Sequence, residues 1–213
     1  MNEKQPRPGE CSTPETESAE RPPRRSPRIR LTLATETPWP GHSQWIDAAV
    51  PSEELERHAR ELLDRHPESD ADGVLICDSD DFADYTPESS EDLATVAMVA
   101  RGIQEHGDAF AFWAHFHDAD PRMLAAFEQA YLGEWDSPAA WVEAQFERLG
   151  AATHDDPSGD WTYGEIAQQL WTEGHLVIAH NDNGRVWLFQ NVEGGTTELP
   201  GSTAPDRPQG GDR

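Results

Sequence analysis

The order of apolar and polar positions predicts a strand, strand, helix, strand segment near the start of the chain. Apolar residues alternate with polar ones in RIRLTLAT (28–35), which is the period of a half-buried strand. SQWIDAAV (43–50) and GVLICD (73–78) are two further expected strands. Between these two, apolar residues recur at helical spacing after Ser52, which we expect to cap the helix. This pattern is typical of a small α+β unit.

The next stretch has a helical pattern. Ser89 is placed to cap a helix that Gly107 ends. Residues 108–117 predict a short, largely buried helix, and an Asp-Pro pair opens a further helix over 120–131. We therefore expect a helical unit in the middle of the chain.

The last part of the pattern is mixed. YLGEWD (131–136) predicts a turn or a strand, and a Ser-Pro pair opens a helix over 137–150. A capping box, Thr followed three residues later by Glu, opens a helix over 162–171. Two apolar runs then flank Asn183-Gly184, a strong short-range hairpin signal. The second half therefore predicts another α+β unit.

These elements define an expected α+β fold of three small domains in series. The two ends are rich in Pro and polar residues and cannot bury enough surface to offset chain entropy, so we expect disorder there. The expected division is a disordered Pro/Arg-rich tail (1–27), an N-terminal α+β domain (28–87), a central helical domain (88–127), a C-terminal α+β domain with a final hairpin (128–192) and a disordered tail (193–213).

The charge of the chain says more about its expected partners than the rest of its composition does. The net charge of the 213 residues is -25, and the single lysine is Lys4. Residues 31–192 hold 7 basic and 32 acidic groups, so the acidity lies in the body. A body this acidic repels nucleic acid and anionic membranes, so its expected partners are basic surfaces.

Targeting and redox signals predict a soluble cytoplasmic protein. No apolar run approaches the roughly 18 residues of a membrane span, and the N-terminus lacks the apolar core of a signal peptide. Cys11 lies in the Pro-rich tail and Cys77 in an expected strand, so we expect no disulfide between them.

Catalytic and metal motifs are weak. The Asp cluster at 78–84 lacks the EF-hand spacing, since Phe82 and Ala83 stand where that loop has a ligand and a glycine. His115 and His117, two positions apart on an expected helix, point apart. Nucleophile-elbow, Walker and dinucleotide motifs are absent from the sequence. We therefore expect no enzyme, no cofactor and no metal ligand. A metal-dependent enzyme that uses the Asp78–Asp84 cluster stays open as an alternative.

The distribution of acids favours charge presented to a partner. From residue 66 to 147 only Arg101 and Arg122 interrupt the acidic groups, whereas an ordinary solvated surface mixes the two signs. The helix after Ser52 does mix them, with expected ion pairs Glu53–Arg57, Glu56–Arg60 and Glu61–Arg65. Duplex DNA carries two charges per base pair, so a net charge of -25 matches roughly 12 base pairs. General acidic adaptation and another basic partner stay open as alternatives to mimicry of phosphates.

Several stretches together resemble the ArdA family of antirestriction proteins. They are QWIDA (44–48), LICDSDDF (75–82), SSEDLATVAMVARGIQEHGDAFAFWAHF (89–116), AFEQAYLGEWDSPAAWVEAQFERLG (126–150) and YGEIAQQLW (163–171). The stretch around EQAYLGEWDS resembles the antirestriction motif of that family. The resemblance covers about residues 28–192, in the family's order.

The resemblance implies a mechanism and a partner. It implies an elongated three-domain protein that forms a homodimer through its C-terminal domain and mimics bent B-form DNA. It also implies occlusion of the DNA groove of type I restriction-modification enzymes, chiefly of their methyltransferase core, and carriage of the gene on mobile elements.

Two groups of residues are the expected interaction site. Acids in loops, at helix caps or on exposed faces are expected to replace phosphates: Asp78, Asp80, Asp81, Asp84, Glu88, Glu91, Asp92, Asp108, Asp118, Asp120, Glu128, Glu134, Asp136, Glu143 and Glu147. Aromatic residues near the motif are expected to pack in the core or in the dimer interface: Phe127, Tyr131, Trp135 and Trp187. Trp113, Trp141, Trp171 and Trp187 are all expected on apolar, buried faces.

Overall fold

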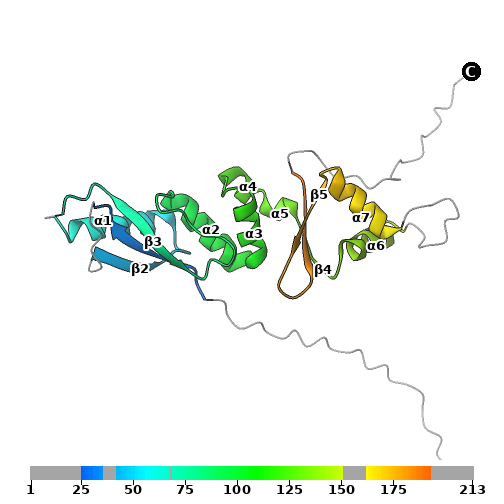
Figure 1. Cartoon of the computed structure of the whole chain (residues 1–213), viewed down its shortest axis with the longest axis horizontal. Helices are drawn as coiled ribbons and strands as arrows, with labels where there is room; N and C mark the ends of the chain where they lie inside the picture. The colour runs from blue at the N-terminus through cyan, green and yellow to red at the C-terminus, as the bar shows by residue number, and fades with distance from the viewer. Residues whose placement is uncertain (1–24, 36–41, 68, 151–161, 193–213) are drawn as a thin grey trace, which may run out of the picture.

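Two three-stranded antiparallel sheets, joined and covered by helices, make up the fold of the computed structural model (Figure 1). The structure describes residues 25–35, 42–67, 69–150 and 162–192. The fold class is therefore α+β, as expected. Residues 1–24 and 193–213, on which most of the two expected tails fall, lie outside the described residues.

The first sheet consists of β1 (Arg28–Leu33), β2 (Ser43–Asp47) and β3 (Val74–Asp80), in the order β2-β1-β3. Ile29, Leu31 and Leu33 alternate into the core from the central strand, where α1 (Ser52–Asp64) buries Leu55 and Leu62. The predicted cap of α1 is wrong. Pro51 is the N-cap residue, and Ser52 is already helical.

A one-residue bulge in β3 separates its apolar part from its acidic part. Arg30 is opposite Asp78 and Leu31 is opposite Ile76, so Cys77 is the extra residue. Its thiol donates to the Arg30 carbonyl at 3.3 Å. Because side chains alternate along a strand, the extra residue inverts the pattern beyond it. Ile76 is buried, whereas Asp78, two positions on, is exposed.

The middle of the chain is helical. The helices are α2 (Leu93–His106), α3 (Asp108–Phe116), α4 (Pro121–Ala125) and α5 (Phe127–Ala130). Gly107, at φ 76°, ends α2 as predicted, and Asp120 caps α4 by accepting from the Arg122 amide at 2.8 Å. Ser89 does not cap α2, because the helix begins after Asp92.

The helix predicted over 120–131 is broken in two at Ala126. The indole of Trp113 donates to the Met123 carbonyl at 2.6 Å. In an unbroken helix that carbonyl would accept from the amide of Phe127. Here the Met123 carbonyl accepts instead from the Trp113 indole and, at 3.1 Å, from the Ala126 amide.

The second sheet consists of β4 (Tyr131–Trp135), β5 (Leu176–His180) and β6 (Val186–Gln190), in the order β4-β6-β5. The hairpin at Asn183-Gly184 is confirmed, with Gly184 at φ 74°. Helices α6 (Pro138–Arg148) and α7 (Tyr163–Thr172) cover one face. The caps are as predicted: Ser137 caps α6, and Thr162 with Glu165 forms a capping box at α7.

The two faces of the second sheet join two different clusters of buried side chains. Ala179 and Phe189 belong to the cluster that continues through the central helices into the first sheet. Leu176 and Leu188 belong to the cluster under α6 and α7. The sheet accordingly lies between α5 and the pair α6 and α7 (Figure 1). The prediction for Trp171 is wrong, since its side chain is 53% exposed.

Candidate functional site

The loop after β3, residues 81–92, is acidic and fixed by its own buried residues. Phe82 and Tyr85 are 3% and 7% exposed. The Ile76 amide donates to the Ser89 carbonyl at 2.9 Å, which holds the far part of the loop against β3. Asp81 has φ 63° and Ala83 has φ 52°, so the chain turns sharply on entering the loop. The acidic side chains therefore project from a defined backbone.

A buried tyrosine ties this loop together. The Tyr85 hydroxyl donates to the carboxylate of Glu91, which also accepts from the Glu88 amide at 2.9 Å. Burial raises the pKa of Tyr85, and the hydrogen bond to Glu91 raises it further. The hydroxyl therefore keeps its proton and stays a donor.

An arginine of β1 neutralises one of the two acids at the end of β3. Arg28 of β1 lies 2.6 Å from the Asp80 carboxylate, and its guanidinium is 5.3 Å from the ring centroid of Trp45. Arg30 stands opposite Asp78 in the strand register, yet its side chain donates to the Ser43 hydroxyl at 2.9 and 3.1 Å. Asp80 is therefore compensated within the protein, and Asp78 has no ion pair among the described residues.

The acidic end of β4 follows a second bulge. Tyr131 is opposite Phe189 and Gly133 is opposite Leu188, so Leu132 is the extra residue. Gly133 has φ 105°, and a Cβ there would lie 3.2 Å from the indole nitrogen of Trp135. That nitrogen donates to the Leu132 carbonyl at 2.9 Å, which closes the bulge.

Arg185, in the hairpin loop, binds the two acids that follow this bulge. It lies 2.9 Å from Asp136 and 3.6 Å from Glu134. Asn181 also donates to the Glu134 carboxylate at 2.7 Å. One arginine therefore holds this pair of acids beside the hairpin.

The fifteen predicted phosphate surrogates divide into two groups by their contacts. Besides Asp80, Glu91, Asp120, Glu134 and Asp136, described above, Asp78 accepts from the Ser79 amide at 3.0 Å and Glu128 lies 3.9 Å from His106. Asp108 is half-buried in the first turn of α3. Seven further side chains are exposed and make no hydrogen bond or ion pair with another described residue: Asp81, Asp84, Glu88, Asp92, Asp118, Glu143 and Glu147.

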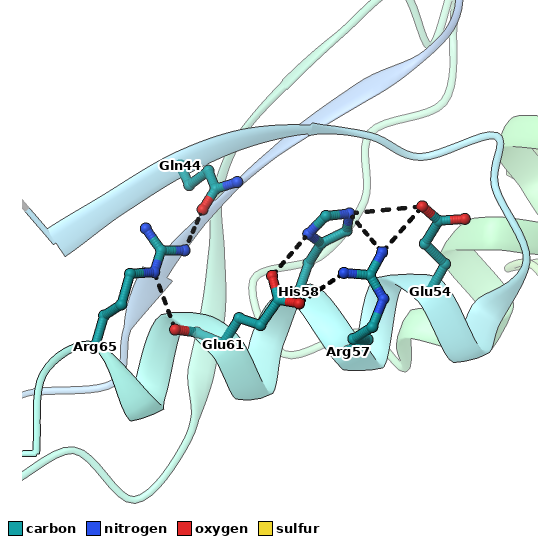
Figure 2. A network of polar contacts seen from close by, with 6 residues as sticks. All are labelled: Gln44, Glu54, Arg57, His58, Glu61 and Arg65. Carbon is teal, nitrogen blue, oxygen red and sulfur yellow. Dashed lines mark hydrogen bonds and ion pairs between the residues drawn. The ribbon is translucent and has the colours of Figure 1, made fainter.

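The acids of α1 differ, because arginines neutralise them along the helix (Figure 2). Arg57 lies 2.6 Å from Glu61 and 3.1 Å from Glu54. The predicted Glu56–Arg60 pair is present at 3.7 Å. Two other predicted pairs are wrong: Arg57 pairs with Glu54 and Glu61 rather than Glu53, and Arg65 donates to the Glu61 backbone carbonyl and to Gln44. This face mixes signs as an ordinary solvated surface does.

The predicted aromatic residues lie around the second sheet. Phe127 is 2% exposed and stacks on Tyr131 with ring centroids 5.1 Å apart. Tyr131 and Trp187 are half-buried against the larger cluster, and Trp135 is half-buried against the cluster under α6 and α7. Three of the four residues therefore pack in or against the larger cluster, and Trp135 packs against the other.

Among the residues that the structure describes, one group of side chains that could ligate a metal lies together, and the sequence analysis did not single it out. Glu105, His106 and Glu128 place one ligand atom each within 4.8 Å of one another. Glu105 and His106 end α2 and Glu128 lies in α5, so spacing along the sequence gave no signal. The carboxylates of the Asp78–Asp84 cluster form no such group among the described residues.

Comparison with known proteins gives one family. The model of the family described as "Antirestriction protein (ArdA)" matches residues 41–183. No curated protein and no solved structure matches the chain. Within the described residues, no helix is both long and apolar enough to cross a membrane.

Proposed function

Because the chain belongs to the ArdA family of antirestriction proteins, we propose that it inhibits type I restriction-modification enzymes by occupying their DNA-binding groove. Its acids replace the phosphates of duplex DNA, and the methyltransferase core of the enzyme is the partner. It acts by binding, without a cofactor or a catalytic step, in the cytoplasm where the enzyme meets incoming DNA.

The observation that carries this proposal is the rigid, uncompensated acidic loop 81–92. Asp81, Asp84 and Asp92 are exposed and have no cation among the described residues, while Phe82 and Tyr85 anchor the loop in the core. Bringing like charges together costs free energy, and a fixed backbone meets that cost during folding rather than during binding. A groove built to hold phosphates supplies the missing cations.

Helix α6 adds further exposed acids to the proposed surface. Glu143 and Glu147 lie one turn apart on an exposed helical face. Like charges at this spacing weaken a helix. Here they place two uncompensated carboxylates on the same exposed face of α6. The proposed surface therefore includes acids next to the first sheet and on a helix that covers the second sheet.

The proposed assembly is an elongated homodimer of three domains in series, paired through the C-terminal domain. A monomer of net charge -25 corresponds to roughly 12 base pairs and a dimer to roughly 25. The larger footprint suits an enzyme that encloses a long stretch of duplex. Sedimentation equilibrium measures the assembly, and a monomer at working concentration would contradict the dimer while leaving groove binding open.

Competition for a type I methyltransferase tests the function. A labelled duplex that carries the recognition sequence is bound to the enzyme, and the protein is titrated in while fluorescence anisotropy follows the duplex. We expect full displacement, with an apparent affinity that weakens as salt rises because the contacts are ionic. Polyglutamate of equal total charge is the control for charge alone. Displacement no better than that of the polymer would reject the proposal.

A further inference from the structure

The end of α2 and the start of α5 form a second site that charge presentation does not explain. The Nε2 atom of His106 lies 3.9 Å from a carboxylate oxygen of Glu105 and 3.9 Å from one of Glu128. Both distances exceed the usual 2.7–3.2 Å of a hydrogen bond. One ring nitrogen thus faces two carboxylates at a separation that leaves room between them.

This separation fits a shared metal ion. Zinc binds imidazole nitrogen and carboxylate oxygen at about 2.0–2.2 Å in a tetrahedral arrangement, so two of its ligand atoms lie about 3.4 Å apart. The two distances to His106, both 3.9 Å, exceed this separation by about 0.5 Å. The third distance, between the two carboxylates, is within 4.8 Å, and the exposed side chains, at 71% and 79%, are free to close the difference.

Packing fixes the imidazole more firmly than the carboxylates. The ring of His106 lies against Phe127 and Phe110, with centroids 4.8 and 5.8 Å away, and its side chain is 24% exposed. The histidine is thereby held in one orientation while the two acids close over it. A fixed ligand loses less entropy when it binds an ion.

We propose that Glu105, His106 and Glu128 bind one divalent transition-metal ion of the zinc type. The imidazole selects such ions over magnesium, which prefers oxygen ligands and gives up its water reluctantly. Water completes the coordination, since the two acids are exposed. The ion neutralises two carboxylates and links α2 to α5, the helix that leads into β4. This site does not depend on the proposed function.

Zinc titration of the full chain tests the site. Isothermal titration is carried out at about 0.15 M salt with excess magnesium, which occupies the diffuse atmosphere of cations around an acidic protein. We expect saturable uptake at one zinc per chain. Glu128→Gln and His106→Gln should each weaken it by at least about tenfold, since even changes outside the ligand shell cost 10–100-fold.

Two variants control for charge and for histidine number. Glu143→Gln removes one exposed acid from α6, and His115→Gln removes one exposed histidine from α3; both should leave the zinc affinity unchanged. His42 and His66, with ring centroids 4.1 Å apart, are the other pair of histidines that could compete for zinc. Absence of saturable uptake, or an affinity in Glu128→Gln equal to that of the unmodified chain, overturns the proposal. Glu128 is exposed, so this variant tests the site even if His106→Gln fails to fold.

Discussion

Arg28 and Asp80 face each other across β1 and β3, with guanidinium and carboxylate 2.6 Å apart. The side chains are 49% and 45% exposed, and an ion pair this exposed contributes about 0–1 kcal/mol to stability. Its larger effect is on charge, because it cancels one negative group of the proposed surface.

Arg28→Gln should strengthen inhibition modestly and change stability by less than about 1 kcal/mol. The substitution frees Asp80 to pair with a cation of the partner. Arg60→Gln is the matched control, since it also removes one cation from a surface pair, with Glu56 at 3.7 Å, but on the mixed face of α1. Competition titrations of both variants measure the effect, and equal gains would mean that only net charge matters.

No single acid should dominate binding, because exposed charges are individually screened. Asp80→Asn should therefore barely change inhibition. A variant that neutralises six of the seven uncompensated side chains should weaken it strongly: Asp81→Asn, Asp84→Asn, Asp92→Asn, Asp118→Asn, Glu143→Gln and Glu147→Gln. Asn tolerates the positive φ of Asp81 and Asp118.

A second sixfold variant separates position from total charge. It neutralises exposed acids outside the proposed surface: Glu53, Glu56, Asp64, Asp70, Asp72 and Asp182. The displacement assay should show a much smaller loss for this set. Complete loss of inhibition in Asp80→Asn with the fold intact would instead indicate a catalytic or metal-binding role.

The melting temperature should rise between low salt and about 0.15 M, because salt screens the repulsion among acids. Calorimetric scans in sodium chloride and in potassium chloride should give the same rise. A neutral osmolyte of equal osmolality controls for effects other than screening. A flat or falling curve would mean that the acids are already paired.

Tyr85→Phe should destabilise the protein by about 1.5 kcal/mol at neutral pH, since it removes a hydrogen bond to a charged group. The effect depends on pH. Burial raises the pKa of Tyr85 in the folded protein, while an unfolded tyrosine ionises near pH 10. Above about pH 10 the unfolded state therefore holds fewer protons, and the stability from this group falls as pH rises.

The difference in free energy of unfolding between Tyr85→Phe and the unmodified chain should accordingly shrink from pH 9 to pH 11. Urea unfolding at each pH gives this difference. A constant difference over the range would show that the hydroxyl of Tyr85 is not protected from ionisation.

Gly133→Ala should cost roughly 1–3 kcal/mol, the usual cost of a sparsely populated backbone conformation. Gly133 has φ 105°, and the new Cβ would lie 3.2 Å from the Trp135 indole. Gly164→Ala is the control, since Gly164 lies in α7 with only the Thr162 hydroxyl nearby, at 3.8 Å. It should stabilise by about 0.4–1 kcal/mol. Thermal unfolding gives the change in stability of each variant. Similar changes for the two would contradict a backbone requirement for glycine at position 133.

Local signals in the sequence predicted much of the second half of the fold. The cap at Ser137, the capping box at Thr162 and the turn at Gly184 each depend on residues within a few positions. Such features need no information from distant parts of the chain. The same holds for Gly107, whose positive φ ends α2.

Several of the errors came from contacts between residues that are distant in the sequence, whereas those at the Ser52 and Ser89 caps were local. Pairing with β1 carries β3 on to Asp80, against the poor strand propensity of Asp. The Trp113 indole, ten residues before Met123, divides the helix predicted over 120–131. Arg185 binds Glu134 and Asp136 from about fifty residues away along the chain. The contacts that sort the acids into compensated and uncompensated groups are therefore visible only in the fold.

The bulges at Cys77 and Leu132 make the two acidic strand ends more sensitive to deletions than to substitutions. Asp78 to Asp80 and Glu134 to Asp136 each follow one inserted residue. Exchanging a side chain there alters one charge, whereas deleting a single codon would turn the following acids toward the core and apolar residues toward water. Natural variation and directed libraries should thus tolerate many substitutions in these segments but keep their length constant.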